Sequence, residues 1–252
     1  MRRYLHCAII LTALIAALIP PARAADKRDK VDLLLVLAAD VSRSVDSIKF
    51  KLQREGYAAA VSNARVLDAI KSGRNQRIAM LFLEWSGNGN QKVVIDWTII
   101  DGQKTAQAFA DQLLESPRAF ADRTSISAGI DGAVAQFARA PWFAERQTID
   151  VSGDGTNNSG RSVTAARDEA LRLGITINGL VILSDTPMPW NPEHTNPPGG
   201  LAQYYRDNVT GGPGSFVVEA KDFNSFGEAI VKKMIAEIAD ATQSLPPLTI
   251  TR

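Results

Sequence analysis

Three oxygen-bearing side chains follow a strongly apolar run near the start of the chain. Residues 31–39 read VDLLLVLAA, and Asp40, Ser42 and Ser44 come next at alternate positions. A short run of Leu, Val and Ala is typical of a strand buried on both faces, as in a parallel sheet covered by helices. Carboxylate and hydroxyl oxygens suit Mg2+, and open α/β sheets bind ligands beyond the carboxyl ends of their strands. The pattern therefore favours a divalent-cation site, although Asp and Ser are also ordinary turn and helix-capping residues.

Two more polar residues occur at comparable places further along the chain. Thr124 precedes residues 126–138, which are rich in Ala, Ile and Val at helical spacing, so a hydroxyl lies at the amino terminus of a predicted helix. Asp154 lies in a Gly-Asp-Gly turn directly after a predicted strand at 146–152. A second carboxylate thus lies just past the end of a strand.

The elements that position these residues alternate along the chain. Further strands are expected at 77–85, 92–99, 175–183 and 215–219, and further helices at 45–70, 105–114, 163–173, 201–208 and 223–241. The turn at 86–90 is too short for a crossover and permits only an antiparallel hairpin. The expected fold is α/β, with a doubly wound, mostly parallel central sheet, one antiparallel edge strand and helices on both faces.

The order Asp40-x-Ser42-x-Ser44, then Thr124, then Asp154 resembles the metal-ion-dependent adhesion site of von Willebrand factor type A and integrin inserted domains. All five positions match in type and order, and the resemblance covers residues 31–241. The simple layout is also similar to secreted bacterial single-domain members of that superfamily whose function is uncharacterised. The fold implied is the von Willebrand A type, which is Rossmann-like.

The resemblance also implies how the site works. Ser42 and Ser44 would ligate the cation directly, Thr124 directly or through water, and Asp40 and Asp154 mainly through waters. Neutral hydroxyl ligands leave most of the charge on the cation, so an Asp or Glu side chain of a partner protein completes its coordination. Mg2+ suits such a site, with Mn2+ as a possible substitute. This implies a protein-binding module and no enzymatic activity.

Several other residues are candidates with an equally ordinary alternative. Asp150, inside a buried strand, either braces the metal loops or is a structural carboxylate paired with an Arg or with backbone amides. Glu84 and Trp85 end a strand and either rim the partner surface or pack against a helix. Asn157 is a further candidate for that rim or an ordinary turn residue. Trp190, in the proline-rich loop at 184–200, is either a partner anchor or part of a rigid cover.

Two alternative functions remain open. One is a metal-free interaction scaffold of the same fold. The other, less favoured, is a Mg2+-dependent hydrolase using Asp40 and Asp154. A Ser/His/Asp hydrolase has little support, because the sequence lacks a Gly-x-Ser-x-Gly motif and His194 is the only histidine after His6.

Residues 1–24 are typical of a secretory signal peptide. Arg2 and Arg3 precede an apolar run at 7–19 that is too short to span a membrane, and Ala22-Arg23-Ala24 offers a cleavage site. We expect a domain at 25–243 and a loose tail at 244–252, exported to the periplasm or the extracellular medium without stable membrane insertion. Cleavage would leave 25 basic and 27 acidic residues, a net charge that does not indicate nucleic-acid binding. It would also leave no cysteine. The sequence leaves the oligomeric state unknown.

Overall fold

The computed structural model of the chain describes residues 28–184 and 191–239. Its six-stranded sheet has the order β3-β2-β1-β4-β5-β6, in which only the β2 and β3 pair is antiparallel. The expected doubly wound sheet with one antiparallel edge strand is confirmed. The strands are β1 (Leu34–Asp40), β2 (Ile78–Trp85), β3 (Gln91–Ile100), β4 (Gln147–Gly153), β5 (Thr176–Ile182) and β6 (Val217–Ala220).

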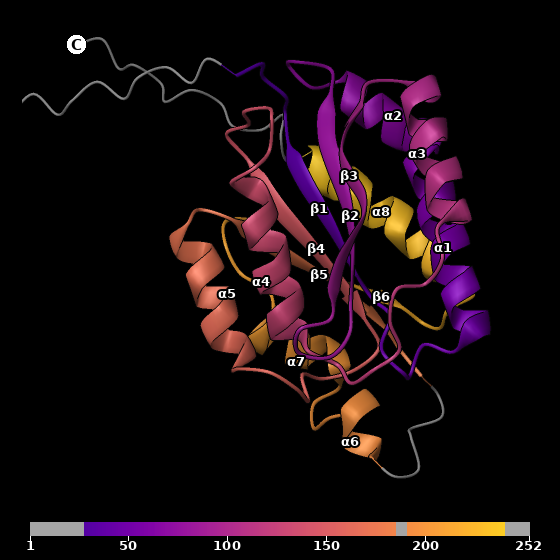
Figure 1. Ribbon diagram of the computed structural model, residues 1–252, viewed down its shortest axis with the longest axis vertical. Coiled ribbons are helices and arrows are strands. Elements are labelled where there is room, and N and C mark those ends of the chain that lie inside the picture. The colour runs from indigo at the N-terminus through magenta and orange to yellow at the C-terminus, as the bar shows by residue number, and fades with distance from the viewer. Residues whose placement is uncertain (1–27, 185–190, 240–252) are drawn as a thin grey trace, which may run out of the picture.

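Helices cover both faces of the sheet (Figure 1). One face packs against α1 (Ser47–Val61), α2 (Ala64–Lys71), α3 (Gln103–Glu115) and α8 (Phe226–Ala239). The opposite face packs against α4 (Ile126–Phe137), α5 (Val163–Arg172) and α7 (Leu201–Asn208). The short helix α6 (Pro192–Thr195) lies apart from both layers, at the lower end of the molecule in Figure 1.

The central strand β1 supplies side chains to both layers. Leu35 and Leu37 enter the core beneath α1 and α8, whereas Leu34 and Val36 enter the core beneath α4. Each is at most 1% exposed, and burial of one such side chain contributes about 1.5–3 kcal/mol. Burial on both faces explains why the run is unbroken rather than alternating.

The helix expected over residues 45–70 is instead two helices. Asn63 interrupts it, because its Oδ1 accepts a hydrogen bond of 2.9 Å from the Arg65 backbone N–H and so caps α2. Ser62 Oγ donates to the Ala58 carbonyl at the end of α1, 2.9 Å away. Ser and Asn side chains compete with the helical hydrogen-bond ladder in this way, which a reading of apolar spacing alone misses.

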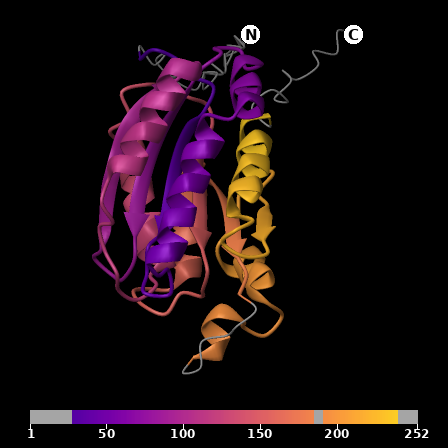
Figure 2. The ribbon, with the colours of Figure 1, turned by 90° about the vertical axis from the view of Figure 1, so that its right-hand side faces the viewer.

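The parallel strands bring their carboxyl ends to one edge of the sheet, at the bottom of Figure 2. Asp40 at the end of β1 pairs in register with Trp85 of β2, and Ala39 pairs with Ser152 of β4. The loops after β1 and β4 therefore start side by side. This register positions the candidate site.

Candidate metal centre

The first loop of the site follows β1 directly. Asp40 ends the strand fully buried, and its Oδ1 accepts a hydrogen bond of 2.7 Å from the Ser42 backbone N–H. The hydroxyl oxygens of Ser42 and Ser44 lie 3.1 Å apart. Adjacent ligands of an octahedral cation with bonds of about 2.1 Å lie about 3 Å apart. The two hydroxyls therefore have the spacing of neighbouring metal ligands.

The second loop follows β4 and brings a carboxylate to the first. Asp154 is buried, and its Oδ1 accepts a hydrogen bond of 2.6 Å from Ser44 Oγ. Its Oδ2 lies 3.7 Å from Lys49 Nζ, which also donates to the Ser44 carbonyl over 2.9 Å. The Lys49 ammonium thus offsets part of the negative charge at the site.

The third loop ends at the amino terminus of α4. Ser125 caps this helix, since its Oγ accepts a hydrogen bond of 3.3 Å from the Ala128 backbone N–H. Thr124 is tied to the second loop twice. Its backbone N–H donates to Asn158 Oδ1 over 2.9 Å, and its carbonyl accepts from the Asn158 backbone N–H over 2.9 Å. The loops that carry Thr124 and Asp154 are therefore held together.

Residues of all three loops line one small open cavity of about 130 Å3. Ser44 comes from the first loop, Thr124 from the third and Asn158 from the second. The full lining consists of Arg43, Ser44, Asp122, Arg123, Thr124, Asn158, Asn191 and His194. A cation placed between the three loops would therefore be reached by a partner from outside.

The donors suit a cation held through hydroxyls and waters. Asp40 Oδ2 and the Tyr205 hydroxyl are both buried, and neither has a hydrogen-bond partner within the described residues. A Cβ at Gly153 would lie 3.1 Å from the first and 2.6 Å from the second, so only glycine leaves room for both atoms at this position. Among the described residues, no three His, Cys, Asp or Glu side chains gather closely enough to hold a metal.

The electrostatics of Asp40 fit this interpretation. Burial, and after it the negative charge of Asp154, raises the pKa of Asp40 from 3.8 to about 8. The hydrogen bonds from Ser42 and the charge of Arg118 oppose this rise only in part. A divalent cation beside Asp40 would favour the ionised carboxylate and lower the same pKa.

Arg118 supports the first loop, although nothing in the sequence pattern singled it out. Its Nη2 donates to the carbonyls of Val41 and Ser42 over 2.6 and 2.8 Å, and its Nε donates to the Phe120 carbonyl over 2.7 Å. The guanidinium thereby joins the loop after β1 to the loop before α4. Backbone acceptors carry no sequence signal, so only the structure reveals this support.

The prediction that Glu84 and Trp85 could rim the partner surface is wrong, because both are fully buried. Glu84 Oε1 accepts from Arg54 Nη2 over 2.5 Å, and its Oε2 accepts from the Ala119 backbone N–H over 2.7 Å. Trp85 packs against α4, and a Cβ at Gly129 would lie 2.8 Å from its ring. The alternative interpretation of Trp85, packing against a helix, is the one observed.

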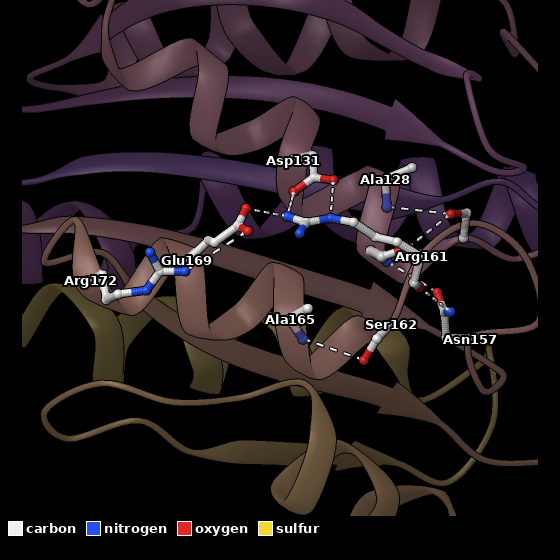
Figure 3. Close-up of polar contacts among 10 residues, drawn as sticks. Ala128, Asp131, Asn157, Arg161, Ser162, Ala165, Glu169 and Arg172 are labelled. Atoms are coloured by element: carbon white, nitrogen blue, oxygen red, sulfur yellow. Dashed lines mark hydrogen bonds and ion pairs between the residues drawn. The ribbon is translucent and has the colours of Figure 1, made fainter.

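Asn157 connects the second loop to α4. Its Oδ1 accepts from the Ser127 backbone N–H over 3.1 Å, and its Nδ2 donates to the Arg161 carbonyl over 3.2 Å. Arg161 in turn bridges Asp131 of α4 and Glu169 of α5, as Figure 3 shows. These contacts give Asn157 a structural role in shaping the second loop.

Asp150 lies within β4 and is fully buried. Its Oδ1 lies 2.9 Å from Lys233 Nζ, and Lys233 also pairs with Glu237, one turn further along α8. The structural alternative for Asp150 is therefore supported, although its partner is a lysine rather than an arginine or backbone amides. A lysine on a helix 83 residues downstream could not be paired with it by pattern alone.

The segment after β5 contributes two cavity residues that were not predicted for the site, Asn191 and His194. His194 of α6 is 4% exposed and lines the same cavity as Ser44 and Thr124. The sequence offered one signal for its role, namely that His194 is the only histidine after His6. Trp190, predicted as a possible anchor in this loop, lies outside the described residues.

Comparison with solved structures identifies the fold. Proximal thread matrix protein 1 of the mussel byssus aligns with a TM-score of 0.56 at 11% identity, over 84% of this chain and 47% of that one. BatB of Bacteroides thetaiotaomicron aligns with a TM-score of 0.51 at 18% identity, over 82% of this chain and 99% of that one. A von Willebrand factor type A protein of Catenulispora acidiphila aligns with a TM-score of 0.51 at 15% identity, over 84% of this chain and 43% of that one. The chain thus spans less than half the length of the mussel and Catenulispora proteins. Its fold is that of a von Willebrand factor type A domain.

The particular family follows from the sequence itself. Residues 30–242 match the family described as protein of unknown function (DUF1194), and the chain belongs to that family. A search of the curated proteins gives no match. A further structure of the mussel protein, at 15% identity, is described as having a zinc-occupied MIDAS motif, the name given to metal-ion-dependent adhesion sites.

Proposed function

We propose that this chain is an exported protein-binding module that holds a divalent cation and uses it to bind an acidic side chain of a partner protein. The cation would be Mg2+, with Mn2+ as a substitute, held by Asp40, Ser42, Ser44, Thr124 and Asp154. The observation that carries this proposal is the meeting of three loops at one cavity, where the Ser44 hydroxyl contacts both Ser42 and Asp154.

The surroundings of the cavity favour an acidic partner. Arg43 and Arg123 line it with exposed side chains, and neither forms an ion pair within the described part of the chain. Hydroxyl ligands leave the cation with most of its charge, so a carboxylate is the natural ligand for an open coordination position. Two nearby guanidinium groups would steer such a group toward the metal and hold it.

Calorimetric titration of Mg2+ and Mn2+ into the metal-stripped protein tests the cation site. We expect binding to the wild type, loss of binding in Asp154→Asn, and a much smaller decrease in affinity in the matched control Asp122→Asn. Asp122 lines the same cavity, but its Oδ2 accepts a hydrogen bond of 3.2 Å from Asn90 Nδ2 and it is not a proposed metal residue. Equal affinities for the wild type and Asp154→Asn would contradict the site.

Partner binding is tested with immobilised wild-type protein and Asp154→Asn, each exposed to extracts of exported proteins with Mg2+ or with a chelator. We expect a partner retained only by the wild type with Mg2+, and lost when its contact Asp or Glu is changed to Asn or Gln. A partner retained equally with the chelator would support the metal-free scaffold instead.

One observation favours the metal-free alternative. The Lys49 ammonium already lies near Asp154 and could hold the loops without a divalent ion. The Mg2+-dependent hydrolase has less support, because the fully buried Asp40 is poorly placed to act on an incoming substrate. We expect no Mg2+-stimulated cleavage of a generic phosphodiester such as bis(p-nitrophenyl) phosphate. Turnover lost in Asp154→Asn would favour the enzyme.

Export is proposed from residues 1–24, which lie outside the described residues. None of the helices between residues 28 and 239 that the structure describes is long and apolar enough to cross a membrane. Amino-terminal sequencing of protein recovered from the periplasm and from the medium tests this part of the proposal. We expect a chain beginning at Ala25 in one of these fractions.

A further inference from the structure

His194 is a buried imidazole placed beside the proposed metal ligands. It belongs to α6, is 4% exposed, and is tied to the second loop because the Thr156 backbone N–H donates to its carbonyl over 2.8 Å. A Cβ at Gly155 would lie 2.3 Å from both Cε1 and Nε2 of the ring. The imidazole is therefore packed directly against the residue that follows Asp154.

The two ring nitrogens face different groups. Nε2 lies 3.3 Å from Thr124 Oγ1, a proposed metal ligand. Nδ1 lies 3.3 Å from Thr156 Oγ1 and 3.4 Å from Asn158 Nδ2. Nε2 is thus the nitrogen on the side of the Thr124 hydroxyl, and Nδ1 is on the far side with a hydroxyl for a partner.

We propose that His194 Nε2 is a further ligand of the cation. The site would then be a mixed oxygen and nitrogen site, and Mn2+, Co2+ or Zn2+ would bind to it more tightly than the Mg2+ named in the proposed function. This inference rests on the proposed function, because it needs the cation at the three loops. It assigns to the site a ligand that comes from a fourth loop. Imidazole suits first-row transition metals, whereas sites made only of hydroxyl, carboxylate and water oxygens suit Mg2+.

The distances agree with this role. Adjacent ligands on one octahedral ion with bonds of about 2.1 Å lie about 3 Å apart. The Ser42 and Ser44 oxygens lie 3.1 Å apart, and Thr124 Oγ1 and His194 Nε2 lie 3.3 Å apart. Each pair therefore has the separation of two neighbouring ligands, and His194 shares one cavity with Ser44 and Thr124.

The tautomer needed for coordination also has a partner. A histidine that binds metal through Nε2 carries its proton on Nδ1 and usually donates it to a nearby oxygen. Thr156 Oγ1 is that oxygen, because a hydroxyl can accept as well as donate. The Asn158 amide is a donor that opposes this tautomer, but its contact with Nδ1 is the longest of the three.

Pulsed electron paramagnetic resonance of bound Mn2+ tests the proposal, since it detects the magnetic coupling of a directly coordinated 14N. The protein is used without a histidine tag, in the wild type, in His194→Gln and in the control Asn191→Ala, which changes an exposed residue of the same cavity. We expect imidazole coupling in the wild type and in Asn191→Ala, and its loss in His194→Gln. We also expect the Mn2+ to Mg2+ affinity ratio to fall about tenfold in His194→Gln.

A second variant guards against a folding defect. In His194→Ala, added free imidazole is expected to restore the nitrogen coupling by occupying the vacated space. Mn2+ bound by the wild type without imidazole coupling, or with an affinity ratio unchanged in His194→Gln, would overturn the role of His194 and leave the cation site standing. Absence of any metal binding by the wild type would overturn both proposals.

Discussion

The Ser44 hydroxyl donates a hydrogen bond of 2.6 Å to Asp154 Oδ1, although the two residues lie 110 positions apart in the chain. The bond joins the loop after β1 to the loop after β4, and these two strands are neighbours in the sheet. A cation at this site would take a lone pair of the Ser44 oxygen, while the Ser44 hydroxyl keeps its proton and still donates it to Asp154 Oδ1. Asp154 can therefore stabilise the cation through Ser44 without contacting it.

We expect Lys49→Gln to raise the affinity for Mg2+ about threefold to tenfold. The Lys49 ammonium lies 3.7 Å from Asp154 Oδ2 and repels an incoming cation, and a partly exposed charge at this range contributes roughly 1 kcal/mol. Calorimetric titration measures the change. The control Lys51→Gln removes an exposed lysine of the same helix, which pairs only with Glu55 in the described structure, and is expected to change little. Equal affinities in the two variants would contradict this role of Lys49.

The stability of the metal-free protein is expected to fall as the pH rises from about 4 to about 8. The pKa of Asp40 is raised from 3.8 to about 8, so in this window the native state holds a proton that the unfolded state lacks. Unfolding then releases a proton, and each pH unit lowers the free energy of unfolding by on the order of 1 kcal/mol.

Urea unfolding of the wild type and of Asp40→Asn, each measured from pH 5 to pH 8, isolates this effect. The variant keeps every other titrating group, including His194, whose pKa is lowered by burial and acts in the opposite sense below pH 6.5. We expect the wild type to lose stability relative to Asp40→Asn as the pH rises, and saturating Mg2+ to remove the difference. Parallel profiles would show that Asp40 is ionised in the metal-free fold.

Gly155→Ala is expected to displace the His194 ring. Its backbone accepts an alanine, but the added Cβ would lie 2.3 Å from two ring atoms. We expect a loss of about 1–3 kcal/mol in the free energy of unfolding, as for other overpacked sites, together with weaker Mn2+ binding. In the control Gly102→Ala the new Cβ meets only the end of the Lys71 side chain, at 3.9 Å. A Gly155→Ala protein with unchanged stability and Mn2+ affinity would show that the ring moves freely.

Lys233→Met is expected to destabilise the fold by about 3–5 kcal/mol. Lys233 is fully buried between Asp150 and Glu237, and its removal leaves two buried carboxylates without their cation. Lys232→Met is the matched control, because it removes the neighbouring lysine of α8, which forms an exposed pair with Glu228 at 3.1 Å. We expect the control to change the free energy of unfolding by less than about 1 kcal/mol. Similar urea midpoints for the two variants would contradict the importance of the buried pair.

Local sequence patterns predicted most of the fold. The apolar run at 31–39 indicated β1, and the short turn at 86–90 required the antiparallel β2 and β3 hairpin that the structure contains. Such patterns work because a strand or helix selects side chains over a few neighbouring positions. The same method missed the break at Asn63, where one side chain competes with the backbone ladder.

The residues proposed for the metal site were also found from the sequence, and the structure places them in three adjoining loops. Asp40 and Asp154 follow strands whose parallel pairing brings both carboxyl ends to one edge, so the order of strands and residues was sufficient to predict that their loops adjoin. The cavity that Ser44 shares with Thr124 and the contact between Ser44 and Asp154 required the tertiary structure.

The sequence by itself therefore determined the alternation of strands and helices and the fold class, and it supplied the five residues proposed for the cation. The tertiary structure alone decided that Glu84 and Trp85 are buried, that Arg118 supports the first loop and that His194 faces Thr124. The physical reason is the range of the interactions. Apolar periodicity can be recognised from residues that are close in sequence. The direction of a charged or aromatic side chain instead depends on which distant loop or helix packs against it.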